Sequence, residues 1–264
     1  MVEMNGRVGN GAFLSHMDKA WASACRVILG GEVGPLSKYE DYLQSGVLPC
    51  RQAKSALSGK QVTISGDYSP CAKFISGDEI SSYGQLAGKV KLDINAIKDI
   101  DSIVEALAGS IHYSGNDLLG NSGPAELSNR LVDSNFVYRS HDVVYSKYVA
   151  CTYICKYGEY IFGCESVGKD THFAIKTYEP FMASRLFECI HAYSSSDCLY
   201  SANVESCQEC LFSFNLRGKR RAIGNLELPQ EKFSALRAKL LEDIRSTLAS
   251  KGSAPSLAEI IGGD

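Results

Sequence analysis

The chain has 264 residues, a formal net charge of −3, 45% hydrophobic residues and 22% charged residues. These values are typical of a globular protein and exclude a predominantly disordered chain. The slight negative charge creates no global basic field, so we expect no nucleic-acid partner. No apolar run approaches the roughly 20 residues that cross a bilayer, and the first residues lack a secretory pattern, so we expect a cytoplasmic protein with no membrane association.

Residues 1–130 are predicted to form an N-terminal α/β region. Apolar residues at three- and four-residue spacing predict a helix over residues 13–29, and a second short helix is expected after Pro35. Residues 61–76 contain strand-forming residues interrupted by glycine and proline, which predicts two short strands.

The last part of this region is predicted to contain one more helical segment and a loop. Residues 93–109 have an apolar stripe and are expected to form one helix or two short ones. Residues 114–127 are rich in Ser, Asn and Gly, so we predict a loop and domain junction there.

Residues 131–228 carry a six-residue repeat, which predicts a β-solenoid. A small residue stands three positions before almost every apolar one, as Ser134 does before Val137. The two series of apolar positions are separated by a step of thirteen residues, which predicts one inserted residue near Pro180. The apolar positions are Val137, Val143, Val149, Cys155, Ile161, Val167 and Phe173, then Leu186, Ala192, Cys198, Val204, Cys210 and Leu216.

A six-residue period excludes a helix, because residues six positions apart would fall on different sides of a helix with 3.6 residues per turn. We expect the apolar residues to point inward, the small residues to lie at bends, and neighbouring aromatic residues to stack in ladders. These aromatic residues are Tyr138, Tyr145, Phe162, Phe187, Tyr193, Tyr200 and Phe212. The hexads are similar to the triangular left-handed β-helix of hexapeptide acyltransferases, but the small residue is placed differently, so the handedness stays open.

The C-terminal part predicts a helix that covers the end of the solenoid. Pro229 suits a first helical position, and an apolar stripe extends through residues 229–252 as an amphipathic capping helix. Residues 253–264 form a tail. The predicted fold is therefore mainly β with α caps.

The segment CLFSFNLRGKRRAIGNLELPQEKFSALRAKLLEDI, residues 210–244, resembles the end of an uncharacterised family of archaea and candidate-phylum bacteria with Cys- and aromatic-rich repeats. Residues 13–43 also resemble archaeal members. The resemblance implies a repeat-rich β architecture and no established activity. Some relatives carry the label of class III CoA-transferase, but this chain is short for that enzyme class and lacks its domain pattern.

The three histidines of the repeat, His141, His172 and His191, are weak catalytic candidates. A hexapeptide-type acyltransferase would use one of them as a general base. Nearby acids (Asp142, Glu159, Asp170) would suit a carbohydrate-active enzyme instead. The simpler interpretation is that the histidines lie at the surface or at corners.

Cys207 and Cys210 form a CxxC pair and are weak metal candidates. In the repeat they are the small and apolar positions, so we expect them to pack as small hydrophobic residues. The chain has ten cysteines and no sign of a secreted disulfide scaffold, so we expect reduced thiols.

A basic cluster follows the repeat and offers a contact for an anion or a partner. Its residues are Arg217, Lys219, Arg220 and Arg221. A solvated turn explains the cluster equally well.

We expect no cofactor. The preferred hypothesis is a non-catalytic structural, assembly or binding protein, a homo-oligomer or a partner of another protein. The alternative is an enzyme built on a β-helix, and a metal-dependent role is a third possibility.

Overall fold

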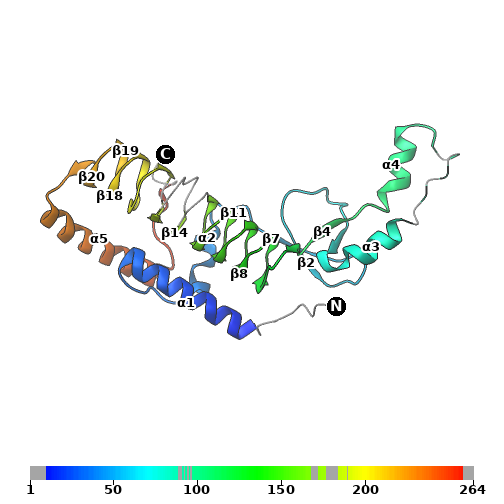
Figure 1. Ribbon diagram of the computed structural model, residues 1–264, viewed down its shortest axis with the longest axis horizontal. Coiled ribbons are helices and arrows are strands. Elements are labelled where there is room, and N and C mark those ends of the chain that lie inside the picture. Colours follow the sequence, from blue (N-terminus) through cyan, green and yellow to red (C-terminus); the bar gives the residue numbers. More distant parts are fainter. Residues whose placement is uncertain are drawn as a thin grey trace.

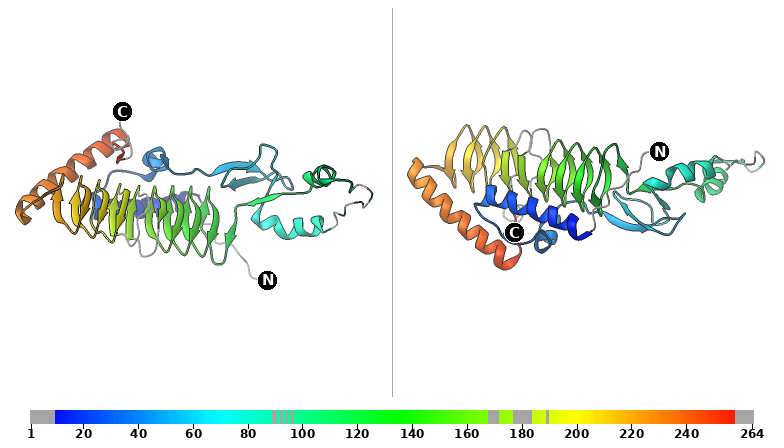
Figure 2. Two further views of the ribbon diagram at one scale, coloured as in Figure 1. Left: turned by 90° about the horizontal axis from the view of Figure 1, so that it is seen from above. Right: turned by 60° about the horizontal axis from the view of Figure 1, so that its bottom comes forward.

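The computed structural model describes residues 10–88, 91, 93, 95, 97–167, 172–176, 184–188 and 190–257. It is an elongated molecule built around a β-solenoid, which confirms the predicted fold class (Figure 1). Helices α1 (Asn10–Leu29) and α5 (Gln230–Lys251) lie on one side of the solenoid. Helices α3 (Ile80–Ala87) and α4 (Ile100–Ala108) extend beyond its N-terminal end (Figure 2).

The N-terminal elements largely match the prediction. The short helix after Pro35 consists of η1 (Leu36–Tyr39) and α2 (Glu40–Gln44). The two strands predicted within 61–76 are β2 (Gln61–Ile64), which pairs with β1 (Arg51–Lys54), and β3 (Phe74–Ser76), which pairs with β4 (Tyr113–Gly115). The turn η2 (Gly77–Glu79) precedes α3.

Helix α4 is shorter than the helix predicted over 93–109. It starts at Ile100 because Asp99 forms a capping box with Ser102, which fixes the helix N-terminus there. Of the residues expected in its apolar stripe, Ile94 lies outside the described residues.

Strands stack along the solenoid on two faces, which we call the first face and the second face. The stacked strands are parallel, except that the last strand of the second face runs antiparallel to its neighbour. The first face consists of β5 (Leu118–Leu119), β7 (Asn129–Val132), β9 (His141–Val144), β11 (Tyr153–Lys156), β13 (Glu165–Val167), β16 (Ile190–Tyr193), β17 (Ala202–Glu205) and β19 (Phe214–Arg217). The second face consists of β6 (Ala125–Glu126), β8 (Asn135–Tyr138), β10 (Lys147–Ala150), β12 (Glu159–Phe162), β14 (His172–Ile175), β15 (Ser184–Phe187), β18 (Gln208–Leu211), β20 (Arg220–Ile223) and β21 (Leu226–Glu227).

Each coil contains two hexads, one on each face. Val137 pairs with Val149, and Val143 pairs with Cys155, so equivalent residues of consecutive coils are separated by two six-residue units. A triangular coil would need three hexads. The triangular β-helix considered from the sequence is therefore wrong for this chain.

Two details of the repeat differ from the prediction. Strands β5 and β6 already stack on β7 and β8, so the solenoid begins within the segment predicted as a loop. The inserted residue lies between Ile161 and Ala174, which pair across β12 and β14, and not near Pro180. Ala174 rather than Phe173 therefore holds the repeat position, and it pairs in turn with Leu186.

The described apolar residues of the repeat point inward, as predicted. The small residues lie at the bends and also form hydrogen bonds there. The described side chains of one interior cluster are fully buried, namely Leu131, Val137, Val143, Val149, Cys155, Ile161 and Cys164. At the bends, the Ser134 hydroxyl donates to the carbonyl of Val132 and accepts from the backbone N–H of Ser146 in the next coil. The small residues therefore satisfy backbone groups that the turns leave unpaired.

A left-handed backbone recurs at every third residue from Leu127 to Tyr160. Between Leu127 and Tyr160 each such residue has φ between 46° and 59°, although none is glycine. This conformation costs about 1–2 kcal/mol per residue outside glycine, so stacked coils must hold it in place.

Apolar side chains on the outer side of the second face bind α1. Phe162, Phe187 and Leu211 point out of the solenoid and are buried in the cluster that contains Phe13 and Trp21 of α1. The Trp21 ring meets the Phe162 ring edge-on at 5.1 Å. Helix α5 continues this layer by packing against α1 and β20.

Both backbone edges at the C-terminal end of the solenoid are covered. Strand β21 turns back and pairs antiparallel with β20. On the first face, the Asn225 side chain accepts from the N–H of Phe214 and donates to its carbonyl, in place of a further coil. These two features terminate the stacking.

Candidate functional site

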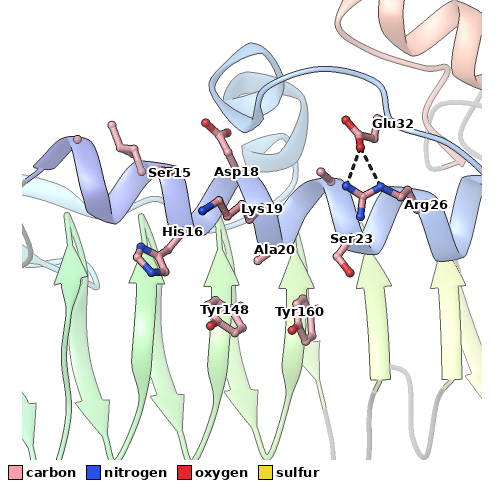
Figure 3. Close-up of a pocket in the computed structure, with 13 residues that line it drawn as sticks. Ser15, His16, Asp18, Lys19, Ala20, Ser23, Arg26, Glu32, Tyr148 and Tyr160 are labelled. Carbon is pink, nitrogen blue, oxygen red and sulfur yellow. Dashed lines mark hydrogen bonds and ion pairs between the residues drawn. The ribbon is translucent and has the colours of Figure 1, made fainter.

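A groove of about 770 Å³ lies between α1 and the second face. Helix α1 places its apolar side on the solenoid through Phe13 and Trp21, so its polar side forms one wall. Figure 3 shows Tyr148 and Tyr160 side by side on neighbouring strands below the helix, where they form the floor.

The floor is an aromatic ladder. The ring of Tyr148 lies 5.1 Å from that of Phe136 and 5.0 Å from that of Tyr160, and His16 of α1 stacks on Phe136 at 5.2 Å. Because successive rings face one another, the ladder presents mainly ring edges and hydroxyl groups to the groove. A sugar or base that needs a free ring face is poorly matched to it.

The carboxylates of the groove are already engaged. Asp18 accepts from the backbone N–H of Leu36, and Glu32 pairs with Arg26 at 2.7 Å. Lys19 contributes an ammonium group to the groove. The groove therefore offers hydroxyl and amino groups for binding rather than two free carboxylates for acid–base chemistry.

His141 faces out of the solenoid, as expected, but it is buried, so its interpretation as a surface residue is wrong. The segment around Leu48 covers it, and its Nε2 lies 2.9 Å from the carbonyl of Leu48. Its Nδ1 lies 2.9 Å from the carboxylate of Asp142, and its ring stacks on Tyr153. Both nitrogens have acceptor partners, so the imidazole fixes the N-terminal segment and is closed to a substrate.

The other two histidines do not join His141. His172 belongs to β14 on the second face, and His191 belongs to β16, several coils away on the first face. Their side chains lie outside the described part of the chain.

The acids proposed from the sequence are also dispersed. Asp142 is on β9 of the first face, where it pairs with Arg130 at 3.1 Å and lines a second groove of about 620 Å³. Glu159 is on β12 of the second face, and Asp170 lies outside the described residues. Asp142 and Glu159 therefore lie on different faces of the solenoid.

Cys207 and Cys210 are packed in the interior, as expected for the small and apolar positions. They form a buried cluster with Cys198, Val204 and Ala222. Hydrogen bonding from the Cys198 thiol lowers the pKa of Cys210, whereas burial raises the pKa of Cys207. Within the described ranges, no group of three or more His, Cys, Asp or Glu side chains is arranged to hold a metal ion.

The basic cluster lies on the last coil, and its cations have partners. Arg217 pairs with Glu205 at 2.9 Å, Lys219 with Glu227 at 2.8 Å, and Arg220 with Glu209 at 3.3 Å. Arg221 donates to Gln230. These ion pairs are largely exposed, so each contributes little and can exchange partners.

Sequence reasoning missed the groove and its ladder. Phe136, Tyr148 and Tyr160 recur at twice the hexad period, which was the available signal, but the partner helix could not be placed.

Comparison of the chain with protein-family models and with curated proteins finds no match. None of the helices in the described part of the chain combines the length and apolar character needed to span a bilayer.

Proposed function

We infer that the chain is a non-catalytic assembly protein that associates with copies of itself in the cytoplasm. One observation carries this inference: no residue of α4 is buried, and Ile100 and Val104 are 75% and 60% exposed. A helix of nine residues is marginal in water by itself and normally buries its apolar stripe. Contact with another chain would bury that stripe.

The backbone caps restrict how association can occur. Because β21 and Asn225 cover the last coil, strand addition at that end is disfavoured. Packing of side chains against α4 needs no free strand edge. Nine free cysteines among the described residues are consistent with a reducing compartment.

The enzymatic alternative has less support. His141 and Asp142 are bound to each other and to neighbouring groups, and the carboxylates of the groove are engaged. A binding role for the groove beside α1 remains compatible with an assembly protein.

Sedimentation velocity over a wide range of protein concentration tests the proposal. We expect the mass to rise with concentration, and Ile100→Asp combined with Val104→Asp to give a monomer. Ala106→Asp, on another side of the same helix, is the matched control and should still associate. A wild-type chain that stays monomeric at every concentration would refute self-association.

A further inference from the structure

We propose that α4 of one copy packs against the last coil of the solenoid in a second copy, residues 210–227, so that copies join head to tail. This inference rests on the proposed self-association and names the two surfaces that meet. The first surface is the apolar stripe of α4 with its acidic flank. The second surface, which we call the terminal coil, carries exposed apolar side chains and the basic cluster.

The two surfaces lie at opposite ends of the molecule. Figure 1 places α4 at one end of the long axis and strands β19 and β20 at the other. Both views of Figure 2 agree with this arrangement. One chain therefore cannot bring its own α4 onto its own terminal coil, and the partner must be another molecule.

Both surfaces expose large apolar side chains that lack cover. On the terminal coil, Phe214 is 55% and Leu226 is 64% exposed, and Asn225 is hydrogen-bonded to the backbone of Phe214. On α4, Ile100 and Val104 are the most exposed apolar residues. Since Asn225 and β21 cap the backbone, the terminal coil can accept a helix through side chains but not a further strand.

The charges of the two surfaces are complementary. Helix α4 contains Asp101 and Glu105 and no basic residue. Residues 210–227 contain one acidic residue, Glu227, and four basic residues. Arg217 is the most accessible of them, with a side chain that is 84% exposed, and its pairing with Glu205 is exposed enough to be exchanged at little cost. Opposite charges around apolar contacts set the orientation and the specificity of such an interface.

This contact is heterologous, because two different surfaces of the same chain meet. Such contacts produce a ring if the rotation closes and an open filament if it does not. An isologous dimer formed by two α4 helices would instead stop at two copies and would not involve Arg217.

Charge reversal on each surface tests the inference. Glu105→Lys and Arg217→Glu should each weaken association, on the order of tenfold, since each places like charges opposite one another. An equimolar mixture of the two variants should recover association, because each reversed surface then meets its complement and each unchanged surface meets an unchanged one. Sedimentation velocity at low ionic strength measures all three samples.

Arg51→Glu is the matched control, because Arg51 is also an exposed arginine in an ion pair but lies on β1. It should leave association unchanged. Circular dichroism of every variant checks that the solenoid is folded. If wild type associates but the mixture does not recover, the head-to-tail contact is wrong and self-association stands. If wild type does not associate at any concentration, the proposed function itself fails.

Discussion

The ammonium group of Lys176 lies 3.1 Å from the carboxylate of Glu188, and both side chains are buried at one corner of the solenoid. The two residues occupy equivalent positions in consecutive coils. Tyr42 of α2 donates to Glu188, and so does the backbone N–H of Leu257 in the C-terminal tail. The pair therefore fastens both terminal segments to the solenoid.

Removing the cation of this pair should destabilise the protein in a pH-dependent way. Burial raises the pKa of Glu188, and Lys176 opposes that rise. In Lys176→Met the pKa of Glu188 should rise further, so the folded chain favours the protonated acid. Stability is then retained at low pH and lost as the pH increases through the raised pKa. We expect a loss of about 3–5 kcal/mol at pH 8 and a smaller loss at pH 5 in urea denaturation.

The matched control for that experiment is the double variant Lys176→Met with Glu188→Gln. It leaves no unpaired charge and keeps a side-chain oxygen at this position as an acceptor, so most of the lost stability should return at pH 8. Equal losses in the single and double variants would mean that packing, not charge, dominates at this corner.

Gly163 should be sensitive to a single added methyl group. A Cβ at this position would lie 2.9 Å from Leu43 Cδ2 and 3.0 Å from the Leu43 carbonyl oxygen, and φ is +71°. Gly163→Ala should therefore lose about 1–3 kcal/mol from crowding beyond the cost of the backbone conformation. Gly224→Ala is the control, because its φ is +55° and nothing lies within 4 Å. Thermal denaturation of both variants should separate the two costs, and equal losses would contradict the role of Leu43.

The hydroxyl groups at the bends bond to backbone groups of consecutive coils, so removing one of them should lower the stability of the fold. Ser140 donates to the carbonyl of Tyr138 and accepts from the N–H of Thr152. Ser140→Ala should cost about 1–3 kcal/mol, because the buried N–H of Thr152 loses its acceptor. Hydrogen exchange at Thr152 should accelerate. Ser58→Ala, at an exposed position, serves for comparison. An unchanged exchange rate at the Thr152 amide would contradict the role of the Ser140 hydroxyl.

The left-handed positions predict an unusual order of substitutions at Ser206, which is exposed and has φ of 53°. Ser206→Gly should leave the free energy of unfolding unchanged or raise it, because glycine adopts this conformation freely. Ser206→Val should lower it by about 1–2 kcal/mol, since a β-branched residue is the poorest fit there. Chemical denaturation of the two variants provides the measurement, and the reverse order would exclude backbone strain at this site.

The interior of the solenoid could be predicted because each inward position is marked by an apolar residue at a fixed spacing along the sequence. Val137, Val143 and Val149 are apolar for the same reason, and a period of six needs no knowledge of which strands pair. The number of hexads in a coil depends on distant pairing, so the sequence left the triangular form open. The predicted position of the inserted residue was wrong for the same reason. Phe173 and Ala174 are both apolar, so the sequence alone could not show which of them holds the repeat position.

The surface was harder to predict. Phe162 and Phe187 were expected to stack in ladders along a face, but the sequence did not show that α1 covers them. Tyr200 and Phe212, both expected in the ladders, do stack, with ring centres 5.1 Å apart. The burial of His141 required the position of Leu48, nearly a hundred residues earlier in the chain. The repeat pattern therefore could not predict contacts that are made by segments distant in the sequence.

Helix α1 contains 20 residues and is therefore about 30 Å long. Neighbouring coils rise by about 4.8 Å, so this helix measures out roughly six of them. The second face contains more stacked strands than that, and α5 takes over from α1 at β20. A coil duplicated beneath α1 would therefore shift the outward apolar residues out of step with this helix, whereas a coil added beyond its reach would not.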